Sequence, residues 1–283
     1  MPVALVTDST AYVPAELVKQ YAITVAPQVL IWGDETFQDG VDIQPDEFYA
    51  RLKTAKIMPT TSQVSVVTMQ GIFQVLIDKG FDVLGIFISE KLSGTMQSAT
   101  QGREALGAAA GKVVIVDSHT TAMAMGFEVL AAARAAEKGA TIKECQKIVE
   151  RSRDYVGVYF AVDTLEFLHR GGRIGGAQRF IGSALNLKPI LALRDGRVEA
   201  IDRVRTKSKA LDRLLELVSA HAKGRANIRL ATLHANAELE ARELLERASR
   251  ELNAVEGILS AVSPVVGTHA GPGTVGLAYM AGM

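Results

Sequence analysis

The residues best suited to ligand chemistry in this chain are hydroxyl side chains placed where a strand gives way to a helix. Ser93-Gly94-Thr95 follows an apolar strand expected over residues 82–89 and precedes an expected helix. The first N–H groups of a helix lack partners inside it, and the helix dipole adds partial positive charge there. Gly94 has no side chain that would keep a ligand away. The stretch can therefore bind a carboxylate or phosphate, although simple N-capping by Ser93 explains it equally well.

Two further hydroxyl-rich segments have the same character. Thr61 and Ser62 lie in "PTTSQ" before an expected helix, and "TDST" at residues 7–10 follows the first strand. Taken alone, "PTTSQ" is better explained as a helix cap. Parallel strands, however, bring the loops at their carboxyl ends to one sheet edge, where open α/β sheets bind ligands. We therefore expect the three segments to converge on one site.

A glycine-dense segment near the end of the sequence contains His269. "VVGTHAGPGTVG", residues 265–276, includes a literal G-x-G-x-x-G. A dinucleotide fingerprint would need a following helix and an acidic residue about twenty positions on, and the sequence does not provide them. We expect instead a turn that presents His269 to a ligand or to a proton, because a histidine between glycines has little core to pack against.

Arginines provide a possible second feature of the site. Arg170 and Arg173 lie in "HRGGRIGG", and Arg203 and Arg205 lie in "DRVRTK". The planar guanidinium group matches phosphate oxygens, while for any single arginine a solvated surface is the simpler explanation. No histidine has a partner at metal-ligand spacing, so no metal site is expected. The absence of G-x-S-x-G, S-x-x-K and Walker A motifs weakens hydrolase and ATPase interpretations.

Composition sets the class of protein. The 283 residues are 48% hydrophobic and 22% charged, which is typical of a globular protein with a substantial core. Lys+Arg and Asp+Glu both number 31, so nothing favours a nucleic-acid binder. We find no apolar run near 18 residues and no signal-peptide pattern, and expect no membrane span. The single cysteine, Cys145, fits a reducing cytoplasm.

Apolar strands alternate with helical stretches through the first half, which predicts βαβ units and a mostly parallel sheet covered on both faces. Residues 23–31 are expected to form one strand, 32–42 a turn-rich segment, and 58–65 a loop. After Arg153 several strands and two helices predict a mixed sheet with helices on one face, beginning with a strand candidate at 157–168. We predict an N-terminal α/β domain over residues 1–155 and a C-terminal α/β domain over 156–283.

Taken together, the motifs resemble those of the DegV family of bacterial fatty-acid-binding proteins. They occur in the family's order and cover nearly the whole chain: "TDSTA", "PTTSQ", "LSGTMQSA", "VDS", "GGRI", "LNLKPIL" and "HAGPGTVG". Met96 and Val64 depart from the pattern, since the family commonly has Tyr and Pro there. The resemblance implies a DegV-like two-domain fold, a three-layer α/β/α parallel-sheet domain plus an α/β mixed-sheet domain, with one fatty acid between them.

The resemblance also implies roles for individual residues and a partner. The fatty-acid carboxylate would be bound by the loop groups and the histidine, and arginines would take part in phosphoryl transfer or partner docking. A separate kinase resembling dihydroxyacetone kinase would use ATP to make the acyl phosphate, and no cofactor other than the bound lipid is implied. The carboxylate residues are Thr61, Ser62, Ser93, Gly94, Thr95 and His269, and the arginines are Arg205, with Arg170 and Arg173 less specifically matched.

Two other functions stay open at this stage. A stand-alone enzyme could use His269 as a general base on a small anionic substrate. A nucleic-acid-binding regulator could use Arg170, Arg173, Arg203 and Arg205, but the neutral total charge disfavours it. The lipid carrier without a complete catalytic apparatus is the leading hypothesis, because a hydroxyl-plus-histidine site occurs without any nucleotide-binding loop.

Overall fold

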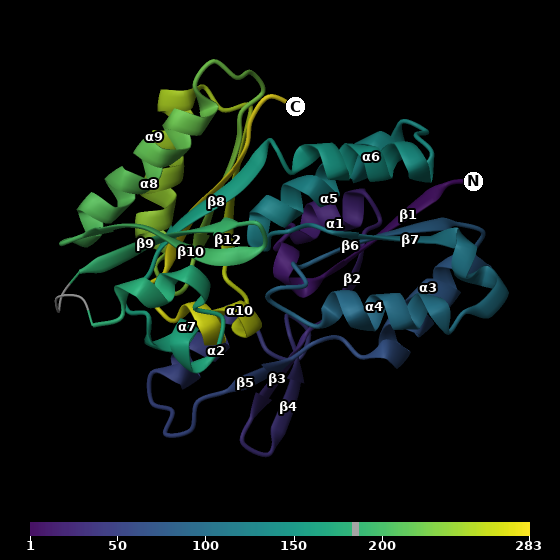
Figure 1. Cartoon of the computed structure of the whole chain (residues 1–283), viewed down its shortest axis with the longest axis horizontal. Coiled ribbons are helices and arrows are strands. Elements are labelled where there is room, and N and C mark those ends of the chain that lie inside the picture. The colour runs from purple at the N-terminus through teal and green to yellow at the C-terminus, as the bar shows by residue number, and fades with distance from the viewer. Residues whose placement is uncertain (183–186) are drawn as a thin grey trace.

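A parallel sheet forms the centre of the first half of the molecule. The computed structural model describes residues 1–182 and 187–283 (Figure 1). Four parallel strands are arranged in the order β2-β1-β6-β7. They are β1 (Val3–Asp8), β2 (Thr24–Ala26), β6 (Asp82–Phe87) and β7 (Val113–Asp117). The strands β1 and β6 are almost entirely buried, as apolar runs in a sheet covered on both faces must be.

Helices cover both faces of this sheet and produce the predicted three-layer α/β/α arrangement (Figure 1). Leu5 and Leu84 pack with α5 and α6 on one face, whereas Val6 and Val83 pack with α3 and α4 on the other. These helices are α3 (Val66–Asp78), α4 (Thr95–Glu104), α5 (Ala122–Glu137) and α6 (Ile142–Ser152). The smaller elements are η1 (Ser9–Ala11), α1 (Ala15–Gln20), α2 (Pro45–Leu52) and η2 (Gly107–Lys112).

A small antiparallel sheet, in the order β4-β3-β5, corrects three expectations. The single strand expected over 23–31 is two strands in different sheets, because Pro27 between them has no N–H with which to continue a ladder. The turn-rich segment contains a hairpin strand, and the loop at "PTTSQ" contains a short strand that pairs with β3. The three strands are β3 (Val29–Trp32), β4 (Glu35–Gln38) and β5 (Thr60–Ser62).

The second half contains a mixed six-stranded sheet in the order β10-β9-β8-β13-β11-β12. Tyr159 and Leu277 pack with α8 and α9 on one face, and Val158 and Ala278 pack with α5 on the other. Helix α5 therefore lies between the two large sheets. The elements are β8 (Val156–Ala161), β9 (Lys188–Arg194), β10 (Arg197–Val204), β11 (Arg229–His234), β12 (Glu256–Ala261), β13 (Val275–Met280), α8 (Lys207–Ala222) and α9 (Glu238–Leu252).

The strand expected over 157–168 is shorter than predicted. Strand β8 ends at Ala161, where its pairing with both neighbours ends, and α7 (Glu166–Arg170) and η3 (Gly175–Phe180) follow. The Thr164 hydroxyl accepts the Glu166 N–H at the start of α7, which favours a helical turn there. An Asp-Gly pair between two apolar runs predicts a hairpin turn, and Asp195 and Gly196 do connect the antiparallel strands β9 and β10, with φ values of 48° and 76° in the left-handed region.

The division predicted at residue 155 separates the strands of the two large sheets, since β7 ends at Asp117 and β8 begins at Val156. That the halves are separate domains stays a prediction. Leu185 and Asn186, which begin the "LNLKPIL" motif, lie outside the described residues.

Candidate functional site

His269 lies on a helix and not on the turn that was expected. Helix α10 (Pro264–Ala270) begins at Pro264, and the residue before it, Ser263, caps it by accepting the Val266 N–H with its hydroxyl. This combination starts a helix despite the glycines nearby. Gly271, with φ of 80°, ends it. The histidine is thus held by a rigid element whose start depends on Ser263.

Asp39 holds the beginning of α10 against the first sheet. Its buried carboxylate accepts the Val265 N–H at 3.2 Å and the Ser9 hydroxyl at 2.6 Å. Burial raises the pKa of Asp39, and these hydrogen bonds oppose the increase. The "TDST" segment therefore contributes to the site by positioning α10, a role that the sequence analysis did not foresee.

Thr61 and His269, which are far apart in the sequence, form a hydrogen bond. The Thr61 Oγ1 of β5 lies 2.8 Å from the His269 Nε2 of α10. Burial, and to a smaller degree the charge of Arg173, lowers the pKa of His269 to about 4, so the ring is neutral at neutral pH. The other ring nitrogen, Nδ1, is buried without a hydrogen-bond partner among the described residues. A proton on Nε2 satisfies the bond to Thr61 and leaves the Thr61 hydroxyl hydrogen free to donate to a ligand.

Ser93 and Thr95 form a second hydroxyl pair at the carboxyl end of β6. The residue that caps α4 is Gly94, and it makes no side-chain cap. Ser93 Oγ instead accepts the Thr95 N–H at 3.3 Å and lies 2.9 Å from Thr95 Oγ1. A Cβ on Gly94 would lie 2.7 Å from the side-chain nitrogen Nε2 of Gln63, so a glycine at position 94 leaves room for the Gln63 side chain. The capping explanation for Ser93 thus holds only in part.

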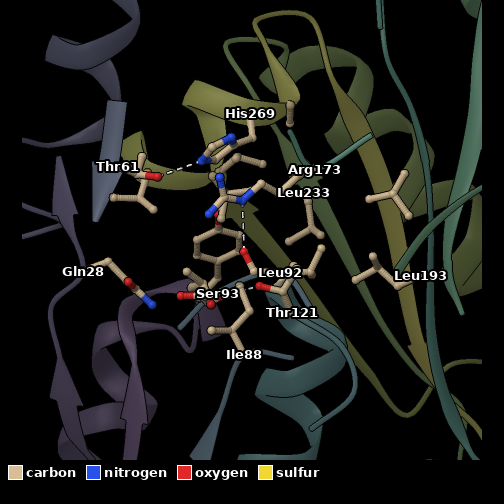
Figure 2. A pocket seen from close by; sticks show the side chains of 18 of the residues that line it. Gln28, Thr61, Ile88, Leu92, Ser93, Thr121, Arg173, Leu193, Leu233 and His269 are labelled. Carbon is tan, nitrogen blue, oxygen red and sulfur yellow. Dashed lines mark hydrogen bonds between the residues drawn. The ribbon is translucent and has the colours of Figure 1, made fainter. Parts of the chain in front are cut away.

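These polar groups border a large cavity, called here the main cavity, with an empty volume of about 990 Å³ including its open part. Figure 2 shows Thr61, Ser93 and His269 on one side of it and Leu193 and Leu233 on the other. Its apolar walls come from both halves of the chain: Ile88, Leu92, Ala122, Val158, Phe160, Leu168, Leu193, Val198, Leu233, Val262, Val265 and Val266. Such a shape, apolar with a few convergent polar groups, is typical of ligand pockets.

The charge of the main cavity favours an anion. Among the described residues that line it, Arg173 is the one permanent cation and no carboxylate is present. Arg173 donates from Nε to the Leu92 carbonyl at 3.0 Å and from Nη1 to the Gly171 carbonyl at 2.7 Å. These bonds hold the guanidinium beside His269, where its field attracts a carboxylate or phosphate.

A second hollow, called here the outer hollow, shares Thr61, Arg173 and His269 with the main cavity. It continues past α7 and the segment before β5, where its further lining residues are Leu52, Met58, Pro59, Thr60, Phe167, Arg170, Gly171 and Thr268. The Arg170 side chain is 55% exposed and pairs with Glu166 at 2.6 Å, so the outer hollow reaches the surface. The polar end of the main cavity therefore lies next to solvent.

The expected site residues are brought together to different extents. Thr61, Ser62, Ser93 and His269 line the main cavity, and the Thr95 hydroxyl forms a hydrogen bond with the Ser93 hydroxyl. The arginines separate: Arg173 lines both hollows and Arg170 only the outer one. Arg205 is exposed between β10 and α8 and lines neither. The three hydroxyl segments do converge, but Thr61 arrives from the small antiparallel sheet and not from the edge of the parallel one.

Sequence reasoning missed Gln28 and Gly171. Gln28 is 2% exposed, lines the main cavity and donates to Thr95 Oγ1 at 2.8 Å. A polar residue following Pro27 within an apolar run was the available signal. Gly171 lies so close to the His269 ring that a Cβ there would be 2.0 Å from Nδ1. No sequence pattern shows such a contact, because 98 residues separate the two positions.

In residues 1–182 and 187–283, no group of three or more His, Cys, Asp or Glu side chains is placed to hold a metal ion. Over the same residues, no helix has both the length and the apolar character needed to cross a membrane.

Comparison with known proteins identifies the family. A family model described as an uncharacterised protein of the DegV family matches residues 2–282. The protein named DegV of Bacillus subtilis is 35% identical over 281 residues, covering 99% of both chains. The chain therefore belongs to the DegV family, as its motifs indicated.

Solved structures of relatives show the same fold. A Thermus thermophilus structure, described as fatty acid binding of a DegV family protein, has a TM-score of 0.94 and 35% identity, covering 99% of this chain and 100% of that one. The Bacillus subtilis DegV crystal structure, described as a fatty acid binding protein, has a TM-score of 0.90 and 33% identity over 99% of both chains. The predicted fold class is thus confirmed.

Proposed function

We propose that this protein binds a long-chain fatty acid in the main cavity and presents the carboxylate to a partner kinase. The observation that carries the proposal is the cavity itself, which joins an apolar wall to one cation, the hydroxyls of Thr61, Ser62 and Ser93, and a neutral histidine. The descriptions of the Thermus and Bacillus relatives as fatty-acid-binding proteins support it. The carboxylate would lie among Thr61, Ser93 and His269, near Arg173.

The energetics agree with a lipid ligand. Burial of an acyl chain contributes about 0.8 kcal/mol per methylene, so about fourteen methylenes offer roughly 11 kcal/mol before the costs of association. A hydrogen bond to a charged group adds about 1.5–3 kcal/mol, part of which repays desolvation. The tail should therefore dominate affinity, while the polar groups fix the orientation of the ligand.

The proposal of a kinase step rests on the position of the outer hollow. A phosphoryl donor must reach the bound carboxylate from outside, and the outer hollow leads from the surface to Thr61, Arg173 and His269. The partner would be a cytoplasmic kinase that resembles dihydroxyacetone kinase and uses ATP to form the acyl phosphate. Arg170 and Arg205 would meet that partner or the transferred phosphoryl group, since both are exposed. A histidine with a pKa near 4 is a weak general base, which disfavours the stand-alone enzyme.

Mass spectrometry tests the binding step. The mass of protein purified without added lipid is measured by native mass spectrometry and again after solvent extraction. We expect one mass increment that extraction releases as a long-chain fatty acid. Protein that is free of lipid and also fails to retain added fatty acids would refute the proposal.

Arginine variants test the kinase step. We expect Arg205→Ala to lower the rate of acyl-phosphate formation by the partner kinase with ATP, while the lipid stays bound. Arg250→Ala removes another exposed arginine, on α9, and serves as the matched control that should leave the rate unchanged. If Arg205→Ala empties the cavity instead, its assignment to transfer or docking is wrong.

A further inference from the structure

Gln28 begins a chain of hydrogen bonds that ends at Ser93. Its backbone lies just before β3, and its side chain is 2% exposed. Figure 2 shows Gln28 and Ser93 on the same wall of the main cavity. The Gln28 Nε2 donates to Thr95 Oγ1 at 2.8 Å, and Thr95 Oγ1 lies 2.9 Å from Ser93 Oγ.

The orientation of the Gln28 amide follows from a second neighbour. The buried Asp8 carboxylate accepts the N–H and O–H groups of Thr10 and the Ile88 N–H; burial raises the pKa of Asp8, and these donors, together with a smaller contribution from the nearby Gln28 side chain, oppose the increase. A carboxylate surrounded by donors acts as an acceptor, so the NH₂ of Gln28 and not its oxygen must face it. The remaining amide hydrogen then points at Thr95.

The direction of the bond between Thr95 and Ser93 follows in turn. Thr95 is fully buried, and its hydroxyl oxygen already accepts from Gln28. The only hydroxyl or carbonyl acceptor recorded for its hydrogen among the described residues is Ser93 Oγ. Because an unmade hydrogen bond is costly in a buried site, Thr95 donates to Ser93.

Ser93 Oγ therefore accepts twice, from the Thr95 hydroxyl at 2.9 Å and from the Thr95 N–H at 3.3 Å. A serine oxygen has two lone pairs and one hydrogen. With both lone pairs used, the hydrogen of Ser93 is left to point into the main cavity. The cavity then offers a hydrogen-bond donor at this position and has no acceptor there.

We propose that Gln28 is a positioning residue which, through Thr95, makes Ser93 a permanent donor and so selects an ionised carboxylate over an uncharged polar head group. The inference rests on the proposed function, because it concerns the carboxylate side of the same cavity. Hydrogen bonds to an ionised acceptor are roughly twice as strong as neutral ones, which is the source of the selectivity. Without Gln28, Ser93 could donate to Thr95 and turn its lone pairs towards the ligand.

The test compares hexadecanoic acid with 1-hexadecanol at pH 7.5, by displacement of a fluorescent fatty acid. We expect the wild-type protein to bind the acid at least tenfold more tightly than the alcohol. Gln28→Met, which keeps the size of the side chain, should weaken acid binding about five- to tenfold and change alcohol binding less than twofold. Gln74→Met, at an exposed position on α3, is the matched control and should change neither.

A double-mutant cycle separates this role from a general structural one. In a Ser93→Ala background, Gln28→Met should weaken acid binding no further, because the donor that it orients is gone. If Gln28→Met does not fold, Thr95→Val interrupts the same chain and should give the same loss. An unchanged ratio of acid to alcohol affinity, or an equal further loss in the Ser93→Ala background, would overturn the inference alone. A wild-type protein that binds neither ligand would overturn the proposed function as well.

Discussion

Gly171→Ala should displace the ring of His269, which lines the main cavity. The glycine caps α7 with φ of −73° and ψ of −9°, a conformation that alanine adopts without strain. An added Cβ, however, would lie 2.0 Å from His269 Nδ1 and 2.8 Å from Cε1. The effect of the substitution is therefore steric and acts on one side chain.

The size of the effect follows from these distances. Ordinary contact begins near 3.4 Å, so the ring must retreat by about 1.4 Å or α7 must shift. A movement of that size breaks the 2.8 Å bond between His269 and Thr61. Overpacking of this kind costs about 1–3 kcal/mol of unfolding free energy. Loss of the hydrogen bond is worth about 1 kcal/mol, which corresponds to roughly fivefold weaker binding of a fatty acid.

The assay combines urea denaturation with fatty-acid titration. Gly71→Ala on α3 is the control, because a Cβ there meets nothing within 4 Å and should raise stability by about 0.5–1 kcal/mol. In a His269→Ala background the ring is absent, so Gly171→Ala should lower the free energy of unfolding only slightly. Wild-type stability together with wild-type binding in the single variant would refute the steric argument.

Two further predictions concern buried titratable groups. The pKa of His269 is lowered from 6.5 to about 4, so the unfolded chain binds the proton more readily than the folded protein does. As the pH falls from 6.5 to 4, the free energy of unfolding of the wild-type protein should therefore decrease by up to about 3 kcal/mol relative to that of His269→Gln. Urea midpoints across that range check this, and parallel curves would contradict it. Glu128 is fully buried with both oxygens unpartnered among the described residues, and burial raises its pKa well above 4.5. The protein therefore loses stability as the pH rises above 4.5. The free energy of unfolding of Glu128→Gln should exceed that of the wild type by about 1–3 kcal/mol at pH 8 but by little at pH 4.5. An equal difference at both pH values would show that Glu128 does not titrate in this range.

The sequence by itself determined the local elements and the residue types of the site. Alternation of apolar runs with helical periodicity predicted the parallel sheet. The T-x-x-E pattern of Thr141 and Glu144 is typical of a capping box, and the structure has that capping box at the start of α6. The hairpin at Asp195-Gly196 was also readable, because only certain residues tolerate positive φ. Ser93 and Thr61 were identified as candidates because they lie in hydroxyl-rich segments before expected helices, at loops expected to converge on one sheet edge. His269 was a candidate because a histidine between glycines has little core to pack against.

Only the tertiary structure decided which of these residues meet. The segment around Thr61 became a strand because β3 offered it hydrogen-bond partners, a long-range pairing that no local pattern contains. The contact of Gly171 with His269 and the bond from Gln28 to Thr95 likewise join segments far apart in the chain. Arg173 and Arg205 look alike in the sequence, yet one lines the main cavity and the other does not. Local sequence sets backbone preference and chemical type, whereas the direction of each donor and the space around each ring depend on packing between distant elements.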